Sequence, residues 1–255
     1  MDILYIIGNG NSKCDNKELM YSLRSIAKYG KGIDDVFVGG YCPEWLSDEI
    51  VKVPHTQPHD TISKKFSSTD GLACKFANVL STILYVVDNT DIGDEFLVSM
   101  DDHFYTREVD FNNYPFYSKF KDNREIPKNV HSGYGKAMAK TRKYLEEQGL
   151  PIYFLTLHRN MHCSRKVIME CREFLDKCVK EALSVEPLCY MLNYWYAKYG
   201  FTITPVNDVK VRNAFDWLST KPEYTEVFST ADFKSTDRLT ALLKELYPDK
   251  CKYEK

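Results

Sequence analysis

The sequence predicts an α/β protein with a mostly parallel, Rossmann-like sheet flanked by helices and with a helical C-terminal portion. Three observations lead to this fold class. Short apolar runs alternate with amphipathic helical segments over residues 1–110. Several of these runs end in glycine or aspartate, as strands do before a loop at the carboxyl edge of a sheet. After Pro115 the apolar residues recur at helical spacing. Strands and helices that alternate in this way are typical of a parallel sheet covered on both faces.

The first half of the chain supplies the predicted sheet. Strands are predicted at Ile3–Ile7, Asp35–Val38, Ile50–Val53 and Glu95–Met100. A helix is predicted over Lys17–Tyr29, because its apolar residues share one face; Asp15 or Asn16 would cap it and Gly30 would end it. A second, more apolar helix is predicted from Ser68 or Thr69 to about Val87.

The second half is predicted to be mainly helical, with one short strand at Tyr153–Leu157. The predicted helices cover Lys136–Gln148, Ser164–Leu183, Pro187–Tyr199 and Ser235–Tyr247. We therefore expect an α/β half over residues 1–115 and a mainly helical half over residues 116–255 of the same domain.

Composition narrows the class of protein. No apolar run reaches the roughly 18 to 20 residues that a membrane span needs. The eight cysteines include no CxxC pair, so neither a zinc ribbon nor a thioredoxin-type motif is indicated. Together with an acidic, strand-like N-terminus in place of a basic signal peptide, this predicts a soluble, cytoplasmic protein.

Charge is unevenly distributed. The net charge is −8 over residues 1–118, +7 over residues 119–180 and −1 over residues 181–255, which gives the overall −2. A basic middle segment can neutralise the phosphates of a nucleotide or of a nucleic acid. It can equally be a solvated surface that faces the acidic first third of the same fold.

The most informative segment is Glu95–Tyr105, EFLVSMDDHFY. An apolar strand runs into Asp101 and Asp102, which are followed by His103. Adjacent carboxylates at a strand end can hold a hard divalent cation, and the cation can in turn hold a diphosphate. The alternative is a solvated turn that His103 caps. Because ligands of parallel α/β sheets bind beyond the carboxyl ends of the strands, the metal–diphosphate interpretation is favoured.

The loop after the first strand is a second, weaker candidate. Gly8, Asn9, Gly10 and Lys13 form a small, hydrogen-bonding loop with one cation. It has the spacing of neither a P-loop nor GxGxxG. Before a helix N-terminus it could hold a nucleotide base or phosphate, or it could be an ordinary strand-to-helix turn.

Two predicted helices also carry candidate ligands for a diphosphate. Lys75 and Asn78 lie one turn apart and share a face, which either contacts a diphosphate or is simply the solvated side of the helix. Arg24 either forms a surface ion pair or reaches the acidic loop.

The segment after Tyr153–Leu157 contains His158, Arg159 and His162. A histidine and an arginine beyond a strand end suit phosphate binding, metal binding or proton transfer near neutral pH. A hydrogen-bonded loop histidine is the alternative. We rank His158 above His162 because it comes first after the predicted strand.

Three segments resemble the Stealth-type capsular polysaccharide phosphotransferases and related GT-A-like glycosyltransferases of bacteria and phages. The N-terminal block is the most specific, and the resemblance covers most of the chain in order. The matching segments are Asn16-x-Glu18-Leu19-x-Tyr21-Ser22-Leu23-Arg24, Phe96 to Phe104, and Lys140-Thr141-x-x-Tyr144-Leu145 through His158; the ending from Leu246 to Glu254 resembles the tail of the phage-type members.

The resemblance implies a GT-A-like fold that binds a nucleotide sugar, with a metal at the Asp-Asp strand end. It matches Asp101 and Asp102 to the metal and nucleotide-sugar carboxylates, Asn16 and Arg24 to the first block, and His158 to the third-block histidine. It implies that residues 1–115 bind the donor and that residues 116–255 form the acceptor side.

The sequence therefore predicts a metal-dependent glycosyltransferase. Its donor would be a nucleotide-diphosphate sugar such as a UDP-sugar, and its cation Mn²⁺ or Mg²⁺ held by Asp101 and Asp102 with His103 or His158. His158 or a carboxylate would be the base. The acceptor would be a polysaccharide or a hydroxymethylated base of phage DNA. Sugar-1-phosphate transfer and non-catalytic nucleotide binding are the alternatives.

Overall fold

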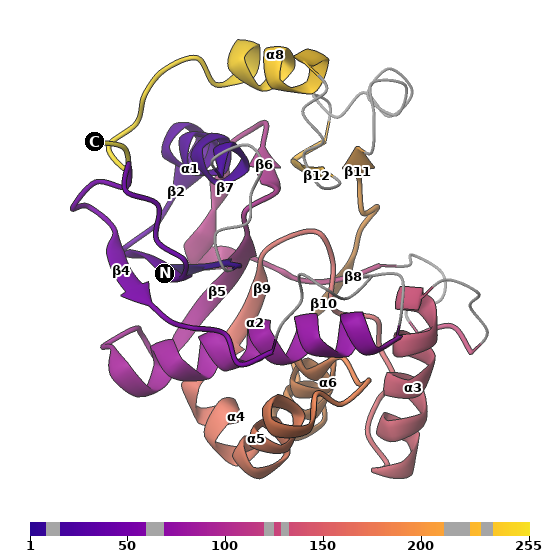
Figure 1. Ribbon diagram of the computed structural model, residues 1–255. Helices are drawn as coiled ribbons and strands as arrows, with labels where there is room; N and C mark the ends of the chain where they lie inside the picture. Colours follow the sequence, from indigo (N-terminus) through magenta and orange to yellow (C-terminus); the bar gives the residue numbers. More distant parts are fainter. Residues whose placement is uncertain (9–15, 60–68, 120–124, 129–132, 212–224, 231–236) are drawn as a thin grey trace.

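The computed structural model confirms the predicted α/β fold (Figure 1). The structure describes residues 1–8, 16–59, 69–119, 125–128, 133–211, 225–230 and 237–255. A five-stranded sheet has the order β4-β3-β1-β5-β9. Its strands are β4 (Val51–Pro54), β3 (Val36–Gly40), β1 (Asp2–Ile7), β5 (Glu95–Met100) and β9 (Met161–Ser164). The first four are parallel, and β9 pairs antiparallel with β5.

Alternation along β1 explains why both faces of the sheet are covered. Leu4 and Ile6 pack into the core on the side of α2 (Thr69–Asn89). Ile3, Tyr5 and Ile7 point to the opposite face, into a core that they share with α1 (Lys17–Tyr29). Successive side chains of a strand point to opposite faces, so an uninterrupted apolar run is a strand buried on both sides. Figure 1 shows α1 on one side of the sheet and α2 with α4, α5 and α6 on the other.

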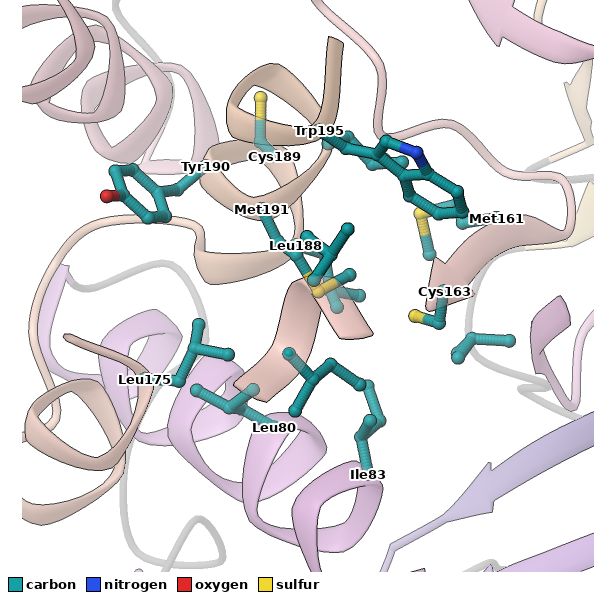
Figure 2. Close-up of a cluster of buried hydrophobic side chains, with 14 of the residues drawn as sticks. Leu80, Ile83, Met161, Cys163, Leu175, Leu188, Cys189, Tyr190, Met191 and Trp195 are labelled. Carbon is teal, nitrogen blue, oxygen red and sulfur yellow. The ribbon is translucent and has the colours of Figure 1, made fainter. Parts of the chain in front are cut away.

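Three helices of the second half pack on α2, namely α3 (Gly133–Glu147), α5 (Arg172–Glu181) and α6 (Pro187–Tyr199), and α4 (Arg165–Glu170) packs on α5 and α6. The last helix, α8 (Asp237–Leu246), lies on the other side of the sheet (Figure 1), where its Leu243 packs in a cluster with Tyr21 of α1. Figure 2 shows Leu80 and Ile83 of α2 beside Leu175 of α5 and Leu188 of α6. The single helix predicted at 164–183 is two helices, because the chain turns at Cys171 between α4 and α5. The α6 bounds agree with the prediction.

The strand predicted at Tyr153–Leu157 is wrong. Only an isolated bridge joins Tyr153 to Glu125 there, and the sheet strand is β9, four residues later. The side chains of Phe154 and Leu155 are buried in the core. The Asn193 side chain accepts from the Tyr153 amide at 2.8 Å and donates to the Tyr153 carbonyl at 2.9 Å. A side-chain amide of α6 thus satisfies backbone groups that a neighbouring strand would otherwise satisfy.

Short strands extend the carboxyl side of the molecule. The strand β6 (His103–Tyr105) follows β5 after a turn and pairs antiparallel with β12 (Val227–Thr230), which pairs with β11 (Lys210–Val211). The other small pairs are β8 (Phe116–Ser118) with β10 (Ile203–Pro205), and β2 (Gly30–Lys31) with β7 (Val109–Asp110), beside the 3-10 turn Phe111–Asn113. The pairing of β6 with β12, and of β12 with β11, brings these two later strands to the segment that directly follows β5.

One described helix is long and apolar enough to cross a membrane by composition. It covers Asp70–Asn89, with a mean hydropathy of 1.3 in its most apolar window. In the fold, 78% of that window is buried against the sheet and the helices of the second half, as expected for a core helix.

Candidate active site

Asp101 and Asp102 form the turn between β5 and β6, at the carboxyl end of the central strand. The amide of Thr230 donates to the Asp102 carbonyl at 3.2 Å, which ties the turn to β12. The side chain of Asp102 is 23% exposed. The turn therefore presents a carboxylate at the position where the fold predicts a ligand.

Negative charge is concentrated around Asp101. Burial, and next the neighbouring charges of Asp102 and Glu18, raise the pKa of Asp101 to about 7. Lys75 of α2 acts in the opposite direction and stabilises the ionised form. Of the diphosphate ligands that we predicted on α2, Lys75 thus lies within electrostatic reach of the carboxylates.

His103 is next to this turn but is enclosed by the protein. Its side chain is 1% exposed, and its Nε2 lies 3.7 Å from Asp102 Oδ1. Burial lowers its pKa to about 4, although Asp102 opposes that shift. His103 is therefore a neutral, interior neighbour of the carboxylate. Its predicted role as a metal ligand stays a prediction.

His158 is held by a residue that the sequence did not single out. Its Nδ1 lies 2.7 Å from Asp208 Oδ2, and its backbone amide donates to Asp208 Oδ1 at 3.1 Å. Burial raises the pKa of Asp208, but the contacts with His158 outweigh burial and the net shift is downward. Asp208 follows the short strand β10, and an acidic residue just beyond a strand end is the signal that singled out Asp101.

Arg159 and His162 point into the protein. Arg159 Nη1 donates to Glu226 at 3.1 Å, and its guanidinium lies 4.8 Å from the ring centre of Tyr117. His162 stacks on Phe116 and its Nε2 lies 2.8 Å from the Tyr114 carbonyl oxygen. Burial lowers the pKa of His162 to about 4. Both side chains have structural partners, and the predicted phosphate contact of Arg159 stays a prediction.

Two other residues that we predicted to bind the nucleotide-sugar donor form hydrogen bonds within the protein instead. The Asn78 side chain accepts from the His59 amide at 2.9 Å and donates to the His59 carbonyl at 2.7 Å. Arg24 donates to both carboxylate oxygens of Glu254, at 2.8 and 2.7 Å. For Arg24 the structure favours the ion-pair interpretation over contact with the acidic loop.

The first loop is described only at its edges. Gly8 follows β1, and a Cβ there would meet nothing within 4 Å. Asn9, Gly10 and Lys13 lie outside the described residues. Asn16 stands at the N-cap position of α1 with φ of 51° and makes no side-chain cap hydrogen bond. The donor roles of these residues stay predictions.

A glycine is required beside this loop, at the end of β3. Gly40 has φ of +95°, and a Cβ there would lie 2.2 Å from the Ile7 carbonyl oxygen. Glycine is therefore needed for β3 and β1 to approach each other at the carboxyl edge.

The carboxylate oxygens of Asp101 and Asp102 are suitable ligands for a hard divalent cation. Among the residues that the structure describes, no three His, Cys, Asp or Glu side chains converge closely enough to hold an ion by themselves. Mg²⁺ commonly takes only one or two protein carboxylates and completes its shell with substrate phosphates and water. Asp101 and Asp102 fit that pattern, because they are adjacent carboxylates, and a cation would neutralise the charges of Asp102 and Glu18 that, after burial, raise the pKa of Asp101.

Comparisons with known proteins identify the fold. No protein-family model and no curated protein matches the sequence. Among solved structures, galactosyltransferase LgtC in complex with donor and acceptor sugar analogues matches with a TM-score of 0.53 and 11% identity, over 97% of this chain and 95% of that chain. An active-site mutant of LgtC matches with a TM-score of 0.49 and 12% identity, over 96% of this chain and 95% of that one. The chain thus has the mixed α/β GT-A fold that LgtC has, as the sequence predicts.

Proposed function

We propose that the protein is a divalent-cation-dependent glycosyltransferase that uses a nucleotide-diphosphate sugar as donor. The observation that carries the proposal is the Asp101–Asp102 turn at the carboxyl end of the central strand, within a GT-A fold. Burial, and next the charges of Asp102 and Glu18, raise the pKa of Asp101 to about 7, and carboxyl groups with such shifted pKa values are typical of ligand sites. A Stealth-type family assignment remains a prediction from the sequence.

The chain's own residues have distinct roles in this mechanism. Asp101 and Asp102 would hold Mn²⁺ or Mg²⁺, which when bound compensates the charge that develops on the leaving nucleoside diphosphate. Lys75, which already stabilises ionised Asp101, would add a positive charge beside the diphosphate. The segment that carries Asp208, the partner of His158, also reaches the same turn, because Lys210 lies 3.9 Å from Asp102.

The acceptor that we propose is a saccharide hydroxyl, as in a polysaccharide. Support comes from the solved complex with the same fold, which contains an acceptor sugar analogue. A hydroxymethylated base of phage DNA remains the alternative acceptor. We also propose a reducing compartment such as the cytoplasm, since no disulfide joins any two of the cysteines that the structure describes.

A panel of nucleotide sugars tests the proposal. The purified protein is incubated with UDP-, GDP-, ADP- and CMP-sugars and Mn²⁺, and the released nucleotide is identified. We expect a nucleoside diphosphate from a UDP-sugar, with no release in EDTA. A monophosphate from a diphosphate sugar would indicate sugar-1-phosphate transfer instead. Binding without any release, with saccharide acceptors present, would indicate a non-catalytic nucleotide-binding protein.

Matched variants link that activity to the site. Asp102→Asn should lose turnover. Asp88→Asn is the control, because Asp88 pairs with Arg172 at 2.8 Å at the far end of α2 and not with the carboxylate turn. Equal activity of both variants would contradict the proposed site.

A further inference from the structure

Asp208 fixes the orientation of His158 by two contacts at once. One carboxylate oxygen accepts from the His158 backbone amide at 3.1 Å, and the other lies 2.7 Å from Nδ1 of the ring. Asp208 is 4% exposed, whereas the His158 side chain is 38% exposed. A carboxylate that accepts the Nδ1 proton leaves the lone pair of the neutral ring on Nε2. The buried partner therefore sets the tautomer, and the ring remains accessible.

The other described histidines of this region lack that combination. His103 is 1% exposed, and burial lowers its pKa to about 4. His162 is buried against Phe116, with its Nε2 at the Tyr114 carbonyl. His158 is the one of the three that is both accessible and held by a carboxylate.

The pair also lies close to the proposed cation ligands. Ser229 of β12 pairs with His103, and its amide donates to the carbonyl of Val209, the residue after Asp208, at 2.9 Å. Asp208 precedes Lys210 by two residues, and Lys210 Nζ lies 3.9 Å from the other oxygen of Asp102. The segment that carries Asp208 therefore reaches the carboxylate turn as well as His158.

We propose that Asp208 is a positioning residue that holds His158 as the base for the acceptor hydroxyl. This inference rests on the proposed function and deepens it, because it assigns the proton acceptor and the residue that orients it.

The step balances without a further reactant. The hydroxyl proton of the acceptor passes to His158 Nε2 while the acceptor oxygen forms a bond to the anomeric carbon. The bond from that carbon to the phosphate oxygen breaks, and its electron pair leaves with the nucleoside diphosphate. The resulting imidazolium is stabilised by the Asp208 carboxylate, as in other His–Asp pairs.

Asp208→Asn tests the positioning role. Asparagine has the same shape, and its oxygen can still accept from the His158 amide. Its NH₂ group, however, would donate to Nδ1 and so leave the ring proton on Nε2, where the base needs a lone pair. Since general base catalysis contributes roughly 100-fold or more, kcat should fall by about that factor. The affinity for UDP with Mn²⁺, measured by calorimetry, should stay within about twofold.

His158→Gln and the double variant show whether Asp208 acts through His158. His158→Gln should lower kcat at least as much as Asp208→Asn. If Asp208 acts through the ring alone, the double variant should be no slower than His158→Gln, because effects of residues that act as one unit are not additive. Asp88→Asn, an ion-paired aspartate of α2, is the matched control and should keep full activity.

Three outcomes would overturn the inference. The first is an Asp208→Asn enzyme that transfers sugar at the unmodified rate. The second is a loss of UDP–Mn²⁺ affinity in either variant, which would make the pair part of donor or cation binding. The third is a double variant whose kcat is lower than that of His158→Gln by the same factor by which Asp208→Asn alone lowers kcat. Failure of the proposed function has a different signature, since the unmodified protein would then release no nucleotide from any donor.

Discussion

Charged groups at the two ends of the central sheet have different surroundings. At the amino ends of the strands, the Asp2 carboxylate accepts from the Gly93 and Asp35 amides, at 2.8 and 3.2 Å. There the guanidinium of Arg165 donates to the carbonyls of Val87, Thr90 and Ile92. At the carboxyl ends, by contrast, the basic groups nearest to the Asp102 carboxylate are at 3.7 and 3.9 Å.

The difference separates stability from function. At the amino end, Asp2 and Arg165 have their hydrogen-bond partners within the protein, and those contacts stabilise the fold. At the carboxyl end, Asp101 is kept close to Asp102 and Glu18, and its pKa rises to about 7. Folding alone does not require such an arrangement, and sites that violate local electrostatic rules are often functional. The comparison predicts that substitutions at the amino ends of the strands change stability, whereas substitutions at the carboxyl ends change sugar transfer.

The largest effect is expected for Asp102→Asn. Removal of this charge should lower sugar transfer by about 100-fold or more, because the cation loses a ligand at the leaving diphosphate. The melting temperature should change little, because the contacts of Asp102 with Lys210 at 3.9 Å and with neutral His103 at 3.7 Å are long. Chelation with EDTA should have the same effect on the unmodified protein. Full activity of Asp102→Asn in EDTA would remove the cation from the mechanism.

Arg165→Met tests the opposite end. The substitution leaves three backbone carbonyls without their donor, and it should lower the free energy of unfolding by about 1–3 kcal/mol. Denaturant titration measures the loss. The kcat of the folded fraction should be unchanged. Lys166→Met is the control, since Lys166 lies over the Tyr199 ring on the surface. A kcat loss without a stability loss would contradict the division between the ends.

Asp101→Asn should make the protein more stable, and only at high pH. The folded-state pKa of about 7 lies above the ordinary value of 3.8, so the fold favours the protonated acid. Ionisation of Asp101 destabilises the folded state; this free-energy penalty is absent below pH 4, grows between pH 4 and 7, and is complete above pH 7. The variant should therefore gain up to about 4 kcal/mol at pH 8, since each unit of pKa shift corresponds to about 1.4 kcal/mol, and almost nothing at pH 4. A gain at pH 4 as large as that at pH 8 would contradict the charge explanation.

Strands and helices whose buried residues follow a regular apolar pattern could be predicted from the sequence. Ile3–Ile7 and Glu95–Met100 are apolar on both faces, and both are strands of the central sheet. Proline at the first position of α6 and Gly200 after its end mark the bounds of that helix. The Asp101–Asp102 turn was found because two charges at the end of such a strand have no place in a core.

Features that depend on distant partners could not be predicted. Residues 153–157 have the apolar pattern of a strand, but the backbone groups of Tyr153 are hydrogen-bonded to the side chain of Asn193, forty residues later. Asp208 looks like any loop aspartate until the chain brings it to His158. Arg159 and His158 are adjacent, yet only the ion pair with Glu226 shows that the arginine is internal. Local pattern specifies periodicity, but it does not specify the partner that satisfies a polar side chain.

A smaller effect is expected for Arg24→Met, which tests a predicted donor ligand. Arg24 and Glu254 are both mostly buried, and their paired contacts join α1 to the C-terminal segment. Loss of the pair should lower the free energy of unfolding by about 1–2 kcal/mol and leave the affinity for UDP with Mn²⁺ unchanged. Glu254→Gln should resemble it. A tenfold loss of UDP affinity in Arg24→Met, without the same loss in Glu254→Gln, would instead support the donor role implied by family resemblance.

The smallest effect is expected from the exposed lysines of α3, which belong to neither end of the sheet. Lys136, Lys140 and Lys143 are exposed, and Lys143 lies 3.7 Å from Glu147, so their charges are largely solvated. Reversal of all three to glutamate should change transfer to a saccharide acceptor by less than about twofold.

If the acceptor is instead DNA, the unmodified protein should bind duplexes of any sequence with an affinity that falls steeply with salt, since phosphate neutralisation releases counterions. The triple reversal should then weaken binding and flatten the salt dependence. An unchanged salt slope would exclude this face from DNA binding, whereas a strong loss would make it an acceptor surface distinct from the carboxylate turn.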